Sequence, residues 1–288
     1  MQENSGESTV QPIDIRQVFR DKNPRLARFI PGIAYWLIEK LVHLDFVNYI
    51  LKKHGNKRGL DFAEASIQEF NITVEVRGEE RLPSGGRYVF ASNHPLGGFD
   101  GMILVTLLQK KYHNLKVLVN DILRNISLMD DIFVPINKHG QQSSEAVREI
   151  DRIFNSDNQI LTFPAGLVSR RKRGVIRDPE WKKNFITKSV SSRRDVIPVH
   201  VSGRCSNVFY FAANLRKFLG IKSNLEMMLL PHETYRHRNE HIVITIGYPV
   251  KWQTFNKSRK AGEWAKKIQE YVYTLADGKA APFNPDEV

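Results

Sequence analysis

Hydrophobic positions along the chain follow two different periods, which predict two kinds of secondary structure. Across residues 15–51 apolar side chains recur at helical spacing with basic residues between them, which predicts one or two amphipathic helices broken near Pro31-Gly32. From residue 71 onward, short β-rich runs alternate with helical stretches. The predicted strands cover 72–76, 88–92, 115–119, 133–136, 160–163, 196–201, 227–230 and 242–246, and the predicted helices cover 101–112, 143–154, 181–190, 208–219 and 259–276.

This alternation is typical of an α/β domain, so we expect a mixed, largely parallel sheet flanked by helices, with an N-terminal helical segment. The pattern divides the chain into residues 1–70, a polar leader followed by the amphipathic segment, and residues 71–288, the α/β domain. In sheets of this kind the chemistry gathers in loops just past the carboxyl ends of the strands.

Composition narrows the class of protein. With 288 residues, 41% of them hydrophobic, the chain can bury a sizeable core. Its one cysteine, Cys205, excludes an intramolecular disulfide and a Cys-rich zinc site and fits a reducing compartment. Residues 1–10 lack the features of a secretory signal, so we expect a cytoplasmic protein. The most apolar early run, 29–38, is shorter than the roughly 20 residues that a membrane-spanning helix needs.

The charge balance favours anionic partners, because 43 Lys and Arg against 31 Asp and Glu give a net charge of +12. Nucleic acid, acidic lipid and an acidic carrier protein all qualify, and a generic basic surface is an equally good explanation. In the N-terminal segment Tyr35 and Trp36, with Arg25, Arg28 and Lys40, could lie at a lipid interface. The alternative is that these helices only pack on the main domain, and both could hold for opposite faces.

The segment 88–101 holds the strongest candidate chemistry. An apolar strand runs directly into His94, two glycines, Gly97 and Gly98, and Asp100 before a helix begins. A histidine there can act as a general base, and a carboxylate nearby can fix its tautomer. Glycines let a substrate approach the backbone, and amides at the helix start could stabilise an oxyanion. A structural hydrogen-bonded pair is the commoner arrangement of His and Asp, so this segment alone leaves both interpretations open.

Four segments in order resemble the glycerolipid acyltransferase superfamily. The first motif is matched by Ser-Asn-His-Pro-Leu-Gly-Gly-Phe-Asp at 92–100, and the second by Phe-Val-Pro-Ile-Asn-Lys at 133–138. The third is matched by Leu-Thr-Phe-Pro-Ala-Gly-Leu-Val-Ser-Arg at 161–170, and the last by Val-Ile-Pro-Val-His-Val at 196–201. Four blocks in register form a specific signal for an acyltransferase.

Departures from the usual motifs point to one branch of that superfamily. Five residues separate His94 from Asp100, where most members have four. This spacing resembles the haemolysin-like branch, which includes O-acyltransferases of ornithine and glycine lipid synthesis. Further similarity at 18–24, 30–32, 202–204, 230–233 and 246–250 extends the resemblance over most of the chain.

The third block gives information about the head group of the acyl acceptor. Ala165 and Val168 stand where phosphate-acceptor relatives carry Glu and Arg. The resemblance therefore favours a monoacylated amino-acid lipid, with a free hydroxyl on its N-linked 3-hydroxy fatty acid and a carboxylate head. A lysophosphatidate acyltransferase is the alternative. A non-catalytic basic module that binds membrane or nucleic acid is a third reading, although no nucleic-acid-binding motif is recognisable and no nucleic acid is expected.

The resemblance also implies the parts of the site. His94 would be the general base and Asp100 its orienting carboxylate. The donor would be acyl-CoA or an acyl-acyl-carrier protein, with no tightly bound cofactor. No metal is expected, because the histidines show no metal-ligand spacing. We expect a peripheral protein on the inner face of the cell membrane. The implied substrate-binding residues are Asn93, Gly97, Gly98, Phe163, Pro164, Gly166, Ser169 and Arg170.

Overall fold

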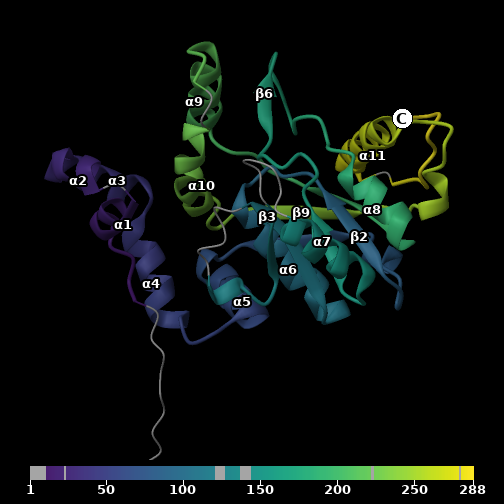
Figure 1. The fold of residues 1–288 in the computed structure, drawn as a ribbon, viewed down its shortest axis with the longest axis horizontal. Helices are drawn as coiled ribbons and strands as arrows, with labels where there is room; N and C mark the ends of the chain where they lie inside the picture. The colour runs from purple at the N-terminus through teal and green to yellow at the C-terminus, as the bar shows by residue number, and fades with distance from the viewer. Residues whose placement is uncertain (1–10, 23, 121–126, 137–143, 222–223, 279) are drawn as a thin grey trace, which may run out of the picture.

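The computed structural model describes residues 11–22, 24–120, 127–136, 144–221, 224–278 and 280–288 (Figure 1). The polar leader at 1–10 and the last two residues of the second block, Asn137 and Lys138, lie outside these ranges, as does His139.

A mixed sheet forms the centre of the described chain. Its seven strands lie in the order β1-β9-β8-β2-β5-β3-β4, and every neighbouring pair is parallel except β8 and β9. The predicted fold class is therefore confirmed. The strands are β1 (Thr73–Arg77), β2 (Tyr88–Ser92), β3 (Leu115–Asn120), β4 (Phe133–Ile136), β5 (Gln159–Thr162), β8 (Asp195–Val201) and β9 (His241–Ile246).

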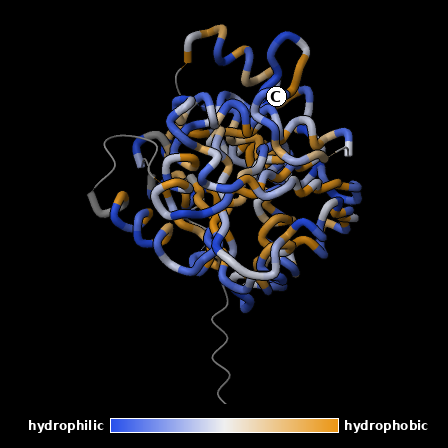
Figure 2. The backbone as a smooth tube through the Cα atoms, turned by 90° about the vertical axis from the view of Figure 1, so that its right-hand side faces the viewer, coloured by the Kyte–Doolittle hydropathy of each residue, from blue (hydrophilic) through white to orange (hydrophobic). Residues whose placement is uncertain are grey.

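Helices cover both faces of this sheet, since alternate residues of a strand point to opposite faces. In β2, Phe90 belongs to the core cluster that contains α5 (Gly59–Phe70) and α6 (Gly98–Tyr112). Its neighbours Val89 and Ala91 belong to the cluster on the other face. That cluster contains α7 (Ser144–Asn155), α8 (Asn184–Ser192) and α11 (Ala261–Thr274). Figure 2 shows the resulting interior of hydrophobic segments.

The N-terminal segment is helical, as its periodicity predicts. Its described residues form more helices than the one or two expected: α1 (Ile15–Lys22), α2 (Pro24–Phe29), α3 (Gly32–Leu41) and α4 (Leu44–His54). The expected break at Pro31 separates α2 from α3. Tyr35 is buried and donates a hydrogen bond to the carbonyl of Ala27, so it cannot lie at a lipid interface, whereas Trp36 is 49% exposed. None of the described helices is long and apolar enough to cross a membrane.

Two further segments project beyond the sheet (Figure 1). One is the antiparallel hairpin of β6 (Arg170–Lys172) and β7 (Val175–Arg177). The other contains α9 (Asn207–Phe218), a 3₁₀ turn (Leu225–Leu229) and α10 (Leu230–Arg236). α10 meets the N-terminal helices, because His43 stacks on Tyr235 with ring centroids 3.6 Å apart.

The strand predicted at 227–230 is wrong, because those residues belong to the 3₁₀ turn and to the start of α10. Met and Leu are unbranched at Cβ and favour helices, so a short apolar run of them does not specify a strand. Pro231 fits the first turn of a helix, where its missing N–H has no partner to lose.

Candidate active site

The candidate base lies in the loop after β2, near the middle of the sheet between β5 and β8. Nδ1 of His94 is 2.9 and 3.0 Å from the two carboxylate oxygens of Asp100. A carboxylate only accepts hydrogen bonds, so Nδ1 carries the proton of a neutral imidazole. Nε2 is then the ring nitrogen with a free lone pair, which is the state that a general base requires.

Asp100 is held rigidly. Its carboxylate is fully buried and accepts hydrogen bonds from the backbone amides of Leu96 at 3.0 Å and Gly101 at 2.8 Å. It also lies in the first turn of α6, where the helix dipole favours a negative charge. The loop and helix therefore fix the carboxylate, and the carboxylate fixes the imidazole.

The exposed part of the imidazole is small, because Phe163 covers one side of it. The His94 side chain is 18% exposed, and its ring centroid lies 4.4 Å from that of Phe163 with the planes tilted by 30°. Phe163 follows β5 in the third block. It therefore helps to orient the ring, in addition to any contact with substrate.

A second buried carboxylate, which the sequence did not reveal, joins the first and third blocks. Asp178 accepts hydrogen bonds from the His94 amide at 3.2 Å, the Ser169 hydroxyl at 2.6 Å and Trp181 Nε1 at 3.0 Å. The Ser169 amide in turn donates to the His94 carbonyl at 2.8 Å. Burial raises the pKa of Asp178, and the bonds from Ser169 and Trp181 oppose that rise. Asp178 thus holds the backbone of His94, the candidate base, in place.

Asn93 and Gly97 have structural contacts. The side chain of Asn93 makes two hydrogen bonds with the backbone of Val201: Nδ2 donates to the Val201 carbonyl at 2.9 Å, and Oδ1 accepts from the Val201 N–H at 2.7 Å. These bonds tie the ends of β2 and β8 together. Gly97 has φ of +73°, and a Cβ there would lie 2.9 Å from Leu230 Cδ2. Gly98, the first residue of α6, has open space where a Cβ would stand. Of these three positions, Gly98 offers room for a reacting group.

The rest of the third block forms a tight turn. The Gly166 amide donates to the Phe163 carbonyl at 2.8 Å, and the Pro164 carbonyl accepts from the Lys182 amide at 3.1 Å. Ala165 and Val168 are buried among apolar residues of two different clusters. The two positions where phosphate-acceptor relatives carry charges are therefore part of the core here.

Arg170 belongs to a cluster of three charges. Its Nη2 is 2.8 Å from Glu226 Oε1, and Nε of Arg216 is 2.8 Å from Glu226 Oε2. Glu226 is buried, and the Arg170 guanidinium also lies over the ring of Phe209, 5.2 Å from its centroid. Burial lowers the pKa of Arg170, and Glu226 opposes this. The two arginines and one glutamate together carry a net charge of +1.

His200 and Cys205 are two other side chains that could act as a base or a nucleophile, and neither is part of the His94–Asp100 pair. Burial lowers the pKa of His200 to about 4. Burial raises the pKa of the Cys205 thiol, which donates to the Pro95 carbonyl at 3.3 Å. Among the described residues, no group of His, Cys, Asp or Glu is arranged to hold a metal ion.

Residues 17–280 match the family described as Acyltransferase, which covers most of the chain. The chain belongs to this acyltransferase family. The resemblance seen in the four blocks is therefore confirmed.

This acyltransferase is similar to two proteins of assigned activity. It is 44% identical over 264 residues to the lyso-glycine lipid O-acyltransferase of Bacteroides thetaiotaomicron, covering 91% of this chain and 97% of that protein. It is 43% identical over 264 residues to the lyso-glycine lipid O-acyltransferase of Phocaeicola vulgatus, covering 91% and 95%. Among solved structures, the 1-acyl-sn-glycerophosphate acyltransferase PlsC from Thermotoga maritima matches with a TM-score of 0.47 at 14% identity, covering 85% of this chain and 97% of that one.

Proposed function

We propose that this acyltransferase moves a fatty-acyl group from a thioester to the hydroxyl of a monoacylated glycine lipid. The observation that carries the proposal is the His94–Asp100 pair, with Nε2 of His94 free to accept a proton. It occurs in a chain that is 44% identical, over 264 aligned residues, to a lyso-glycine lipid O-acyltransferase.

The proposed reaction is a direct transfer. Nε2 of His94 takes the proton of the acceptor hydroxyl while the acceptor oxygen bonds to the thioester carbonyl carbon. The tetrahedral intermediate then breaks its C–S bond, and the protonated imidazole returns the proton to the leaving thiolate. The products are an ester and a free thiol, so the step balances without a further reactant. Asp100 offsets the transient positive charge on His94.

We assign the developing oxyanion to the first backbone amides of α6, apart from that of Gly101, which already donates to Asp100. Amides at the start of a helix have no partner within the helix, and they point toward negative charge. The open space beside Gly98 leaves room for the carbonyl oxygen there. General-base assistance supplies about 10²–10⁴-fold, so positioning and oxyanion stabilisation have to supply much of the rest.

The acceptor head group is assigned from charge. Buried Ala165 and Val168 offer no charge for a phosphate. Glu226 neutralises one of the two arginines beside it, and the remaining single positive charge suits one carboxylate better than a phosphate dianion. A glycine lipid presents a single carboxylate of this kind. We therefore place the acceptor head near Arg170.

The net charge and the exposed apolar side chains support a choice of donor and of location. A net charge of +12 suits an acidic acyl-carrier protein, and acyl-CoA, itself an anion, is the other candidate. No tightly bound cofactor enters the reaction. We propose that the enzyme works on the inner face of the cell membrane, where Trp36 and neighbouring exposed residues of α3 would meet lipid.

Side-by-side kinetics test the proposal. With one acyl-carrier-protein donor, kcat/KM should be higher for monoacylated glycine lipid than for lysophosphatidate. Arg170→Ala should raise KM for the glycine lipid more than for the donor, because it removes acceptor binding. Arg152→Ala, which removes an exposed arginine on α7, is the matched control. A clear preference for lysophosphatidate would overturn the assigned acceptor.

A further inference from the structure

The two sides of α9 differ in what they contact. Phe209, Tyr210 and Ala213 are buried against the body of the protein. The opposite side repeats large apolar residues at helical spacing, and Phe218 on that side is 86% exposed. Exposed apolar patches of this kind mark interaction sites. We define the α9 apolar face by its exposed members, Val208, Phe211, Leu215, Phe218 and Leu219.

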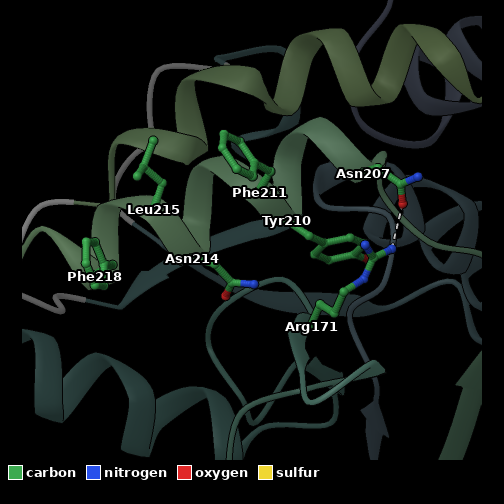
Figure 3. A pocket seen from close by; sticks show the side chains of 7 residues that line it. All are labelled: Arg171, Asn207, Tyr210, Phe211, Asn214, Leu215 and Phe218. Carbon is green, nitrogen blue, oxygen red and sulfur yellow. Dashed lines mark hydrogen bonds between the residues drawn. The ribbon is translucent and has the colours of Figure 1, made fainter.

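The α9 apolar face lies on a projection that includes the β6–β7 hairpin. In Figure 1, α9 and the strand β6 of the hairpin extend beyond the sheet on the same side. The two are joined, because Arg171 Nη2 donates to Asn207 Oδ1 at 2.6 Å and its guanidinium lies 5.0 Å from the Tyr210 ring centroid. Figure 3 shows the groove along α9, with Arg171 toward one end and Phe218 at the other.

The two segments that form this projection carry basic residues and no acidic ones. Residues 202–225 and 165–177 contain no Asp or Glu. Lys172 and Arg173 are exposed on the hairpin, and Lys217 is exposed on α9. An apolar face on a segment that carries exposed cations and no acidic residues of its own is complementary to a bilayer that contains anionic phospholipid, where phosphates overlie the acyl chains.

We infer that the α9 apolar face enters the apolar boundary of an anionic lipid bilayer, with the hairpin cations at the level of the phosphates. This rests on the proposed function, since a monoacylated lipid acceptor resides in a bilayer. The hairpin begins at Arg170, directly after Ser169, whose amide is bonded to the His94 carbonyl. Docking through α9 therefore holds the loop that carries His94 at a fixed position above the membrane surface.

Two other occupants fit the observations less well. An acidic carrier protein would neutralise Lys172 and Arg173 but would leave the apolar side chains at the end of α9 without a matching partner. A second copy of this chain would need to present an apolar surface that matches this projecting helix and its groove in shape. A bilayer accepts an apolar projection without shape complementarity.

A fluorescent label at the end of α9 tests insertion directly. Phe218→Cys, in the full-length protein, is labelled with an environment-sensitive fluorophore, and buried Cys205 keeps the labelling site-specific. On addition of vesicles of phosphatidylethanolamine and phosphatidylglycerol, the emission should shift to shorter wavelength. Val147→Cys, an exposed apolar position on α7, is the matched control and should not respond.

A paired substitution tests the contribution to binding. Phe211→Ser with Phe218→Ser should weaken sedimentation with these vesicles by at least about ten-fold, because two exposed aromatic side chains lose their apolar burial. Phe211→Leu with Phe218→Leu should retain binding. Turnover of a detergent-dispersed acceptor should be unchanged in both, which separates this inference from the identity of the acceptor.

Three results would overturn the inference. The label could fail to respond to vesicles, it could respond to acyl-carrier protein without lipid, or it could respond to rising protein concentration alone. The second result would indicate a carrier surface and the third an interface between copies of this chain. Vesicle binding is measured without acceptor, so a wrong acceptor assignment cannot produce any of them.

Discussion

Replacement of Asp100 by asparagine tests how the site controls its base. The carboxylate serves three donors: Nδ1 of His94, the Leu96 amide and the Gly101 amide. An asparagine amide offers one acceptor oxygen and one donor group in the same space. In either orientation of the amide, the NH₂ group therefore faces a backbone N–H, at Leu96 or at Gly101.

The cost has two parts. A buried donor left without an acceptor destabilises the fold by about 1–3 kcal/mol. The negative charge that stabilises the imidazolium is also lost, and the NH₂ group permits the tautomer in which Nδ1 is unprotonated and Nε2 carries the proton. An Asp-to-Asn change of this type costs a His-dependent enzyme up to about 10⁴-fold, so we expect kcat to fall by about 10²–10⁴-fold. KM should change little, because Asp100 is fully buried and cannot touch substrate.

The assay is steady-state acyl transfer by purified Asp100→Asn, together with a urea unfolding curve that verifies the fold at the assay temperature. Asp61→Asn is the matched control, because Asp61 also lies in the first turn of a helix but is exposed. Near-normal kcat in a folded Asp100→Asn protein would refute the role of the carboxylate.

Other predictions concern the support of the site and its pH dependence. Asp178→Asn should leave a buried donor unpaired, so a urea titration should show an unfolding free energy lower by about 1–3 kcal/mol. Steady-state kinetics should show that the same change lowers kcat more than it raises KM. Gly97→Ala should destabilise by about 1–3 kcal/mol on the same titration, because φ is +73° and the new Cβ would meet Leu230. Hydrogen bonds from Lys53 and His54 lower the pKa of Glu69 to about 2. The stability that ionised Glu69 contributes is fully present at pH values above the pKa that this residue has in the unfolded chain, and it is lost as pH falls toward 2. The difference in Tm between wild type and Glu69→Gln should therefore shrink over that pH range.

Local patterns predicted the framework of the site. The predicted limits of β2 and β4 agree with the structure, since both are apolar runs ended by clear turn residues. The pairing of His94 with Asp100 was also accessible, because both lie in one loop and the spacing has a recognised meaning. Helix α6 begins at Gly98, earlier than predicted, because glycines in its first turn hide its start.

Contacts between distant segments could not be predicted in the same way. Glu226 reaches Arg170 across 56 residues, and Asp178 reaches the His94 amide across 84. Neither carboxylate lies in a motif, and each gains its role only when the hairpin and the α9–α10 segment fold back on the loop after β2. The sequence marked Arg170 as a substrate-binding residue, but it could not show that a buried glutamate 56 residues away pairs with this arginine.

The turnover of His94→Ala measures the central claim most directly. The enzyme is assayed with acyl-carrier-protein donor and monoacylated glycine lipid, and ester formation and thiol release are followed together. Loss of the only proposed proton acceptor should lower kcat by at least about 10²-fold while the circular dichroism spectrum and unfolding midpoint stay close to those of the wild type. A folded His94→Ala enzyme with near-normal kcat would contradict the account.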